Sequence, residues 1–197
     1  ILLAQAITRS ASMKWIFLTG GTSRRFGSEK VKATLNGMDL LQFATRNLID
    51  NSEDLIVVGP KSDLPARYVR EVPEFGGPVA AISAGMHEVD TELVGIFAVD
   101  MPFAPRLIDE FKAALVHDAA LPRDCEGQTQ PLAGLYRSEP LRSALINMGE
   151  VNNQSMKNLI SYLEVDEVRV SSPELLIDID TPEQYLLAQE LASRFAQ

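Results

Sequence analysis

The sequence is short of the residues that would place it in several large classes of protein. It contains one cysteine, Cys125, and two histidines among 197 residues. A single cysteine cannot form an internal disulfide, and so few thiols and imidazoles cannot supply a Cys/His zinc cluster. We therefore expect a cytoplasmic chain that folds on a hydrophobic core in a reducing compartment.

Positive charge is also scarce, because 18 lysines and arginines stand against 27 aspartates and glutamates. The net charge of -9 argues against a general surface for nucleic acid or for anionic lipid, so any positively charged site must be local. Apolar stretches in residues 1–12 are too short and too interrupted for a membrane span. These absences leave a soluble protein with neither a nucleic acid nor a membrane as its partner.

A hydrophobic content of 46% in 197 residues predicts one globular domain. We expect residues 1–12 to form a leader segment and residues 13–197 to form the domain. Short apolar runs alternate with segments of helical period, which is typical of α/β folds. The expected strands are 15–19, 55–58, 93–99, 119–122, 132–136, 167–170 and 175–177, and the expected helices are 40–49, 79–87, 105–116, 139–147, 155–162 and 182–195. This order predicts a doubly wound, mostly parallel sheet with helices on both faces, a Rossmann-like fold that binds its ligand at the carboxyl ends of the central strands.

The stretch LTGGTSRRFGSEK follows the first expected strand and carries the strongest local signal. Gly20 and Gly21 leave room for backbone N–H groups to face phosphate oxygens. The spacing of the glycines is that of neither a P-loop nor a G-x-G-x-x-G fingerprint. Arg25 and Lys30 add two cations suited to a triphosphate, with Lys32 as an alternative lysine. The alternative interpretation is an exposed basic turn.

Carboxylates follow another apolar run and precede the last expected helix. Asp100 ends the strand of VGIFAVDMPF, where it could hold Mg²⁺ or cap the helix that follows. Asp178 and Asp180 lie two residues apart, predicted on one face of a strand. We rank Asp180 ahead of Asp178 as a second metal ligand. Thr181 and Gln184 then predict a capping box for a helix that begins at Pro182.

These segments resemble the nucleotidyltransferases related to molybdenum cofactor guanylyltransferase. Leu18–Lys30 is similar to the signature L-A-G-G-x-S-x-R-M-G-x-D-K, with Phe26 and Glu29 as departures. VDMPF resembles C-D-M-P-F/Y, whose aspartate coordinates magnesium, and Asp100 stands at that position. DIDTPE matches the D-x-D-T-P-E frequent in cytidylyl-transferring relatives, whereas guanylyl-transferring members carry N-x-N-T-P-E.

Two further segments extend the resemblance. Gly77 and Pro78 match the G-P-L-A-G-I segment that lines the nucleotide site, although a plain helix-start turn explains them as well. Gln130 and Pro131 match a Q-P-L segment beside the acceptor, and Asn152–Asn153 precede a segment similar to the family's acceptor-side helix, or act as an N-cap. The resemblance thus implies a nucleotide site made by Leu18, Thr19, Gly20, Gly21, Gly27, Lys30, Gly77, Pro78 and Asp100.

The resemblance implies a Mg²⁺-dependent nucleotidyltransferase that moves GMP from GTP onto the phosphate of molybdopterin or the molybdenum cofactor. Arg25, Lys30 and Asp100 are then the catalytic residues, Asp100 and Asp180 hold the metal, and Gln130 and Pro131 bind the acceptor. Proteins that deliver the cofactor would be further partners. Two alternatives stay open: a cytidylyltransferase acting on the same pterin or a sugar-phosphate nucleotidyltransferase, and a non-catalytic relative that binds a nucleotide or a partner protein.

Overall fold

A computed structural model of the chain describes residues 13–20, 33–46, 48 and 54–195. The predicted leader, residues 1–12, lies outside this part, as do the glycine-loop residues Gly21, Arg25, Gly27 and Lys30. The described elements in chain order are β1 (Met13–Leu18), β2 (Thr34–Leu35), β3 (Met38–Asp39), α1 (Leu40–Thr45), β4 (Leu55–Val58), β5 (Arg67–Val69), α2 (Gly77–Met86), β6 (Leu93–Ala98), the 3₁₀ helix η3 (Ala104–Leu107), α3 (Ile108–Ala114), β7 (Ala119–Pro122), β8 (Ala133–Arg137), α4 (Ser138–Met148), α5 (Met156–Ile160), β9 (Val165–Val168), the 3₁₀ helix η4 (Pro173–Leu176) and α6 (Pro182–Arg194).

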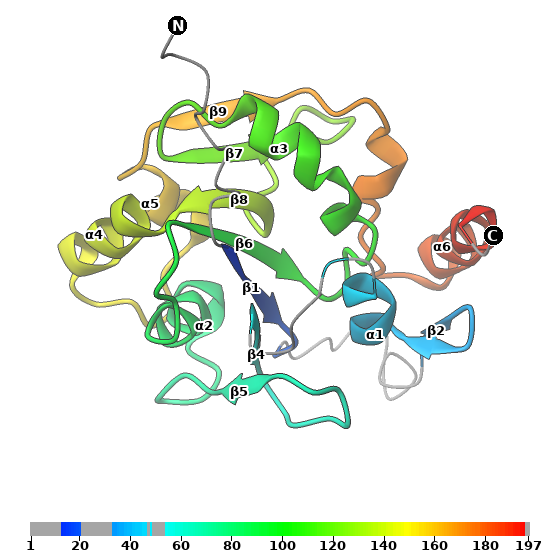
Figure 1. Cartoon of the computed structure of the whole chain (residues 1–197), viewed down its shortest axis with the longest axis horizontal. Coiled ribbons are helices and arrows are strands. Elements are labelled where there is room, and N and C mark those ends of the chain that lie inside the picture. Colours follow the sequence, from blue (N-terminus) through cyan, green and yellow to red (C-terminus); the bar gives the residue numbers. More distant parts are fainter. Residues whose placement is uncertain (1–12, 21–32, 47, 49–53, 196–197) are drawn as a thin grey trace, which may run out of the picture.

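A central sheet carries seven of the described strands in the order β5-β4-β1-β6-β8-β7-β9 (Figure 1). β1 pairs in parallel with both β4 and β6, and β8 runs antiparallel to β6 and β7. The antiparallel strand follows from its connection, because the ten residues between β7 and β8 contain no crossover helix that could return the chain for a parallel pairing. The sheet is therefore mostly parallel, as the sequence predicts.

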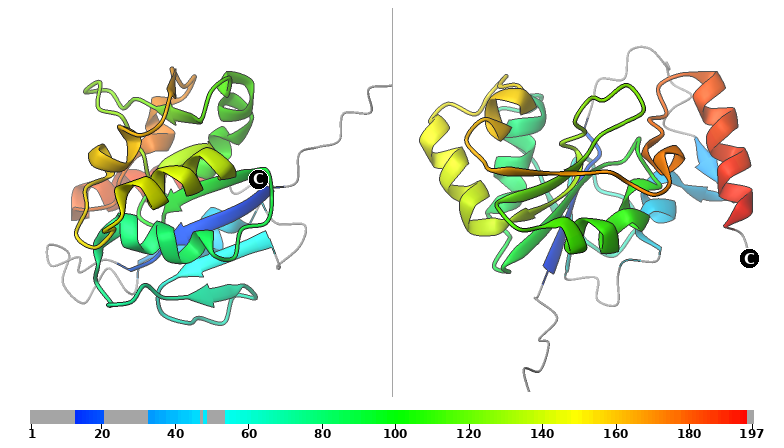
Figure 2. Two further views of the ribbon diagram at one scale, coloured as in Figure 1. Left: turned by 90° about the vertical axis from the view of Figure 1, so that its left-hand side faces the viewer. Right: turned by 90° about the horizontal axis from the view of Figure 1, so that it is seen from above.

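Alternate residues of the central strands enter two separate cores, one on each face of the sheet. Trp15 and Phe17 pack with α1, η3, α3 and α6, whereas Ile16 and Leu18 pack with α2, α4 and α5. This division follows from the alternation of side chains along a strand. The helices accordingly cover both faces (Figure 2), which confirms the doubly wound arrangement.

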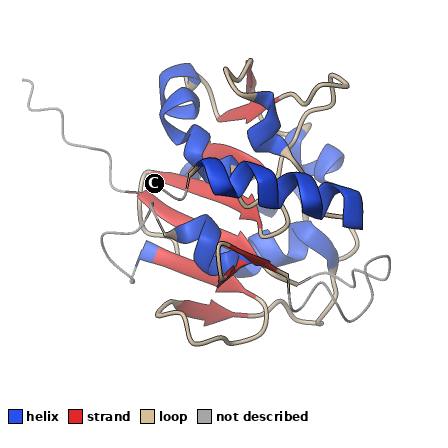
Figure 3. Ribbon diagram, turned by 90° about the vertical axis from the view of Figure 1, so that its right-hand side faces the viewer, coloured by secondary structure: helices blue, strands red, loops and turns tan. Residues whose placement is uncertain are grey.

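The small β2–β3 hairpin lies beside α6, away from the main sheet (Figure 3). The Tyr185 hydroxyl donates to the Thr34 carbonyl at 2.8 Å, and Asn36 Nδ2 donates to the Ala192 carbonyl at 2.8 Å. The last helix is thereby tied to the residues that follow the glycine loop.

One predicted element is wrong, and another is shifted. The strand expected at 175–177 is the 3₁₀ helix η4, in which Leu175 and Leu176 are both buried. A short apolar run does not reveal whether it is strand or helix, and Pro173 at its start favours the helical turn. β9 begins two residues before the expected strand, because its pairing with β7 places Ala119 beside Val165.

The predicted start of α6 is confirmed, whereas the start of α4 differs from the prediction by one residue. Thr181 and Gln184 form the predicted capping box of α6, with Gln184 N–H to Thr181 Oγ1 at 3.2 Å and Thr181 N–H to Gln184 Oε1 at 2.8 Å. Ser138, expected to precede its helix, is the first residue of α4, and Arg137 occupies the N-cap position. The expected helix over 105–116 is divided into η3 and α3.

Candidate active site

Three carboxylates converge where β6 ends. Asp100, Asp178 and Asp180 each offer one oxygen, and these three oxygens lie within 4.8 Å of one another. All three residues are half-buried. Carboxylate oxygens are the ligands that Mg²⁺ prefers, so the cluster fits a magnesium ion.

Backbone contacts position these carboxylates. Val99 N–H donates to the Leu18 carbonyl at 3.1 Å, which joins the ends of β1 and β6. Ile179 N–H donates to the Asp100 carbonyl at 2.9 Å, and the Ile179 side chain is fully buried in the core. Asp178 and Asp180 flank this anchor, which holds both next to Asp100.

The capping box of α6 also positions Asp180. The Gln184 side-chain carbonyl Oε1 accepts from Asp180 N–H at 2.9 Å, in addition to its bond with Thr181. The backbone at Asp180 is therefore held both by the helix cap and by its buried neighbour. The two aspartates lie in irregular chain after η4, so their predicted placement on a strand face is wrong.

The start of the glycine loop lies beside this cluster. Leu18 pairs with Ala98 in the sheet, so Thr19 and Gly20 leave β1 at the same edge at which Asp100 follows β6. Thr19 N–H donates to the Val58 carbonyl at 3.1 Å, and Gly20 is exposed. Gly21, Arg25, Gly27, Lys30 and the alternative Lys32 lie outside the described residues.

Gly77 and Pro78 form the first turn of α2, which begins after β5 at the same edge of the sheet. Gly77 has a φ of +86°, a backbone conformation that favours glycine. Asn153 N–H donates to the Gly76 carbonyl at 2.6 Å. An added Cβ at Gly76 would lie 2.6 Å from Asn152 Oδ1.

Asn152 and Asn153 do not act as the N-cap that the sequence offered as an alternative. Ser155, not Asn152 or Asn153, caps α5, since its Oγ accepts from Asn158 N–H at 3.1 Å. The two asparagines instead pack against the turn that begins α2. No local sequence pattern predicts this contact, because it joins segments more than seventy residues apart.

Gln130 and Pro131 also lie at the carboxylate edge. β8 runs antiparallel to β6, so its first residues lie where β6 ends, and Ala98 N–H donates to the Leu132 carbonyl at 2.8 Å. Gln130 Nε2 donates to Asp124 Oδ2 at 2.6 Å. Partial burial disfavours the charged form of Asp124, but hydrogen bonds from Gln128 N–H and the Gln130 side chain outweigh it and lower the pKa of Asp124.

Tyr136 braces the turn that holds Gln130 and Pro131. Its hydroxyl donates to the Pro131 carbonyl at 2.5 Å, and burial raises the pKa of Tyr136. We expect Tyr136→Phe to lower the free energy of unfolding by about 1 kcal/mol, because the partly buried Pro131 carbonyl loses its donor. Urea unfolding measures this change.

A matched control for this substitution is Tyr162→Phe, at an exposed tyrosine. It should change stability by less than about 0.5 kcal/mol. Equal stabilities of the two variants would contradict a bracing role for Tyr136.

Among the described residues, neither histidine nor Cys125 belongs to the carboxylate cluster. His87 follows the last turn of α2. His117 precedes β7, and its hydrogen bond with Asp166 at 2.7 Å, followed by the charge of Asp166, raises the pKa of His117. Cys125 is exposed in the loop after β7.

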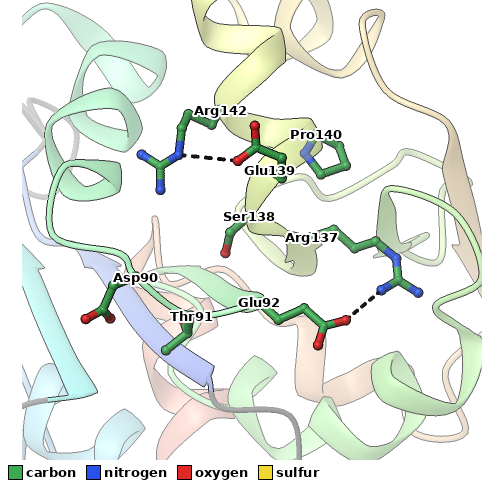
Figure 4. A pocket seen from close by; sticks show the side chains of 8 residues that line it. All are labelled: Asp90, Thr91, Glu92, Arg137, Ser138, Glu139, Pro140 and Arg142. Carbon is green, nitrogen blue, oxygen red and sulfur yellow. Dashed lines mark hydrogen bonds and ion pairs between the residues drawn. The ribbon is translucent and has the colours of Figure 1, made fainter.

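A cavity of about 300 Å³ lies at the opposite edge of the sheet, where β6 begins (Figure 4). Its charged residues are paired with one another or with neighbours: Arg137 with Glu92 at 3.2 Å, Arg142 with Glu139 at 3.9 Å, and Asp90 with Lys14 at 2.6 Å. Parallel sheets bind ligands at the carboxyl ends of their strands. This cavity therefore adds nothing to the candidate active site.

Comparison with known proteins agrees with this fold. Residues 15–168 match the family described as the MobA-like NTP transferase domain. The fold and this match define the chain as a nucleotidyltransferase. The chain belongs to the MobA-like NTP transferase family.

Individual relatives are similar along nearly the whole chain. A probable molybdenum cofactor guanylyltransferase of Nostoc sp. is 30% identical over 189 residues, which cover 88% of this chain and 89% of that protein. The structure of molybdopterin-guanine dinucleotide biosynthesis protein A from Archaeoglobus fulgidus superposes with a TM-score of 0.69 at 21% identity, covering 92% and 100% of the two chains. The 2-C-methyl-D-erythritol 4-phosphate cytidylyltransferase of Thermus thermophilus gives a TM-score of 0.63 at 18% identity, covering 90% and 98%.

None of the helices in the described part of the chain is both long enough and apolar enough to span a membrane.

Proposed function

We propose that the protein transfers GMP from GTP to the terminal phosphate of molybdopterin or the molybdenum cofactor and releases pyrophosphate. The observation that carries the proposal is the convergence of Asp100, Asp178 and Asp180 beside the strand end from which the glycine loop leaves. The 30% identity to a probable molybdenum cofactor guanylyltransferase supports guanine as the base and the pterin as the acceptor.

The residues then have distinct roles. Asp100, with Asp178 and Asp180, would hold Mg²⁺, which supplies charge neutralisation for the phosphates when it is bound. Arg25 and Lys30, together with the N–H groups of Gly20 and Gly21, would bind the departing pyrophosphate. The acceptor phosphate attacks the α-phosphorus and the bond to the pyrophosphate oxygen breaks, so catalysis rests on positioning and electrostatics.

The acceptor would lie on the side of Gln130 and Pro131. The hydrogen bond from Gln130 Nε2 to Asp124 fixes the orientation of the carboxamide. The Gln130 side-chain oxygen would then accept a hydrogen bond from the acceptor. Gly77 and Pro78 would complete the nucleotide side at the start of α2.

The nucleotide is tested by thermal unfolding with GTP, CTP, ATP or UTP in the presence of Mg²⁺. GTP at one hundred times its Kd should raise the unfolding temperature by about 5–10 °C, which corresponds to about 2.7 kcal/mol. Formation of the guanine dinucleotide from GTP and the molybdenum cofactor then tests the transfer itself.

The DIDTPE segment favours a second candidate, cytidylyl transfer to the same pterin. A larger shift with CTP than with GTP, together with CMP transfer, would replace guanine by cytosine in the proposal. A shift with a nucleotide but no transfer would indicate a binding protein instead of an enzyme acting on this acceptor.

The role proposed for Asp180 gives a separate prediction. We expect Asp180→Asn to raise the Mg²⁺ concentration needed for half-maximal activity by about 10- to 100-fold, because a charged oxygen ligand is replaced by a neutral one. Titration of activity with Mg²⁺ at saturating GTP measures the change. If the Mg²⁺ requirement is unchanged, Asp180 is not a ligand.

A further inference from the structure

Two arginines line a second cavity, of about 220 Å³, next to the segment that follows Asp100. Arg46 comes directly after α1 and Arg106 lies in η3, and both are half-buried. Pro102 and Pro105 contribute apolar wall to the same cavity. Asp100 itself does not line it, so this cavity is separate from the carboxylate cluster.

Aromatic rings hold both guanidinium groups in place. The Cζ atom of Arg46 lies 4.2 Å from the ring centroid of Phe43, and that of Arg106 lies 3.9 Å from the centroid of Phe195. Phe103 connects the two rings, with centroid distances of 5.1 Å to Phe43 and 6.2 Å to Phe195. Stacking on a ring occupies the face of a guanidinium and leaves its N–H edge able to bind another group.

A hydrogen bond from Arg46 Nη2 to the Phe195 carbonyl at 3.1 Å fixes Arg46 further. Within the described chain, no carboxylate lies within ion-pair distance of Arg46 or Arg106. Burial, and then the charge of Arg46, lowers the pKa of Arg106. Two like charges therefore repel each other at one cavity, in a chain of net charge -9.

We propose that this cavity binds a small phosphate monoester, with the phosphate between Arg46 and Arg106 and its apolar part against Phe43 and the two prolines. A dianion offsets the repulsion between the two guanidiniums, and their forked N–H groups match phosphate oxygens. The cavity is smaller than the roughly 300–1,000 Å³ of pockets for drug-sized ligands, so the apolar part must be small.

Asp109 also lines the cavity. Removing its charge should strengthen binding of the phosphate, whereas removing either arginine should weaken it. The exposed carboxylate of Asp109 should repel the bound dianion. Asp109→Asn is therefore expected to strengthen binding by roughly 2- to 5-fold, the size typical of exposed charge interactions.

The experiment uses phenyl phosphate as the probe, with inorganic phosphate and benzoate for comparison, and isothermal titration calorimetry on the full chain. Phenyl phosphate should bind more tightly than either comparison compound. Arg46→Gln and Arg106→Gln should each weaken its binding by about 10- to 100-fold.

Arg169→Gln is the matched control, because it removes the same charge from an exposed arginine after β9. It should leave the affinity for phenyl phosphate unchanged. Arg106→Lys keeps the charge without the forked donor and should give an intermediate affinity, which separates lost recognition from lost folding.

No binding of phenyl phosphate to the unaltered protein would overturn the proposal. So would full-strength binding to both glutamine variants, since the anion would then occupy another place, such as the nucleotide site. Benzoate binding as tightly as phenyl phosphate would contradict the requirement for a dianion.

Discussion

Replacing Asp100 by asparagine should lower the kcat of nucleotidyl transfer by about 10²- to 10³-fold. The carboxylate follows β6 and forms one acidic cluster with Asp178 and Asp180. An amide keeps the size of the side chain but removes the charge that would hold Mg²⁺, and losses of this order follow when one group that stabilises transition-state charge is removed. The rate of pyrophosphate release from GTP in the presence of the molybdenum cofactor measures the effect.

The fold should survive this substitution. The backbone carbonyl of Asp100, not its side chain, accepts from Ile179 N–H, so the joint between the two segments is retained. Glu139→Gln is the control, because it makes the same chemical change at a side chain that is 85% exposed. A rate for Asp100→Asn close to that of Glu139→Gln would rule out the proposed metal site.

Lys30→Ala should slow turnover by about 10²- to 10³-fold as well. The proposed function places this ammonium on the departing pyrophosphate, where negative charge develops in the transition state. Arg25→Ala should act in the same way. Single-turnover rates at saturating GTP and Mg²⁺ separate this effect from weaker nucleotide binding.

Lys32→Ala serves as the comparison, because the spacing after Gly27 leaves two lysines as candidates for the phosphate-binding residue. A large loss in Lys32→Ala with little loss in Lys30→Ala would move the role by two residues along the chain. Near-normal rates in both lysine variants would argue against any lysine on the pyrophosphate.

The sequence predicts the layers of this fold well because the signal comes from burial. β4 and β7 have the expected bounds, and the bounds of β1 and β6 lie within two residues of the expected ones. The short strands β2, β3 and β5 were missed, since two or three partly exposed residues carry no readable period. The direction of β8 could be inferred from its connection, because ten residues without a helix after β7 are too few for a crossover to a parallel neighbour.

The candidate site could be predicted in part. Asp100 follows a strongly apolar strand, so its place at the sheet edge could be inferred from its neighbours. The proximity of Asp178 to Asp100 could not be predicted, because it arises from Ile179, whose hydrogen bond and burial join segments nearly eighty residues apart. The contact of Asn152 and Asn153 with the start of α2 is likewise a tertiary contact without a local sequence signal.

The hydrogen bond between Ile179 and Asp100 has a consequence for protein synthesis. All strands of the main sheet precede residue 169, but two of the three clustered carboxylates come afterwards. During translation the acidic cluster is therefore completed only after every strand of the main sheet has been synthesised. A chain that ended before Pro173 would lack two of the three carboxylates, together with the part of the core that Leu176, Ile179 and α6 supply.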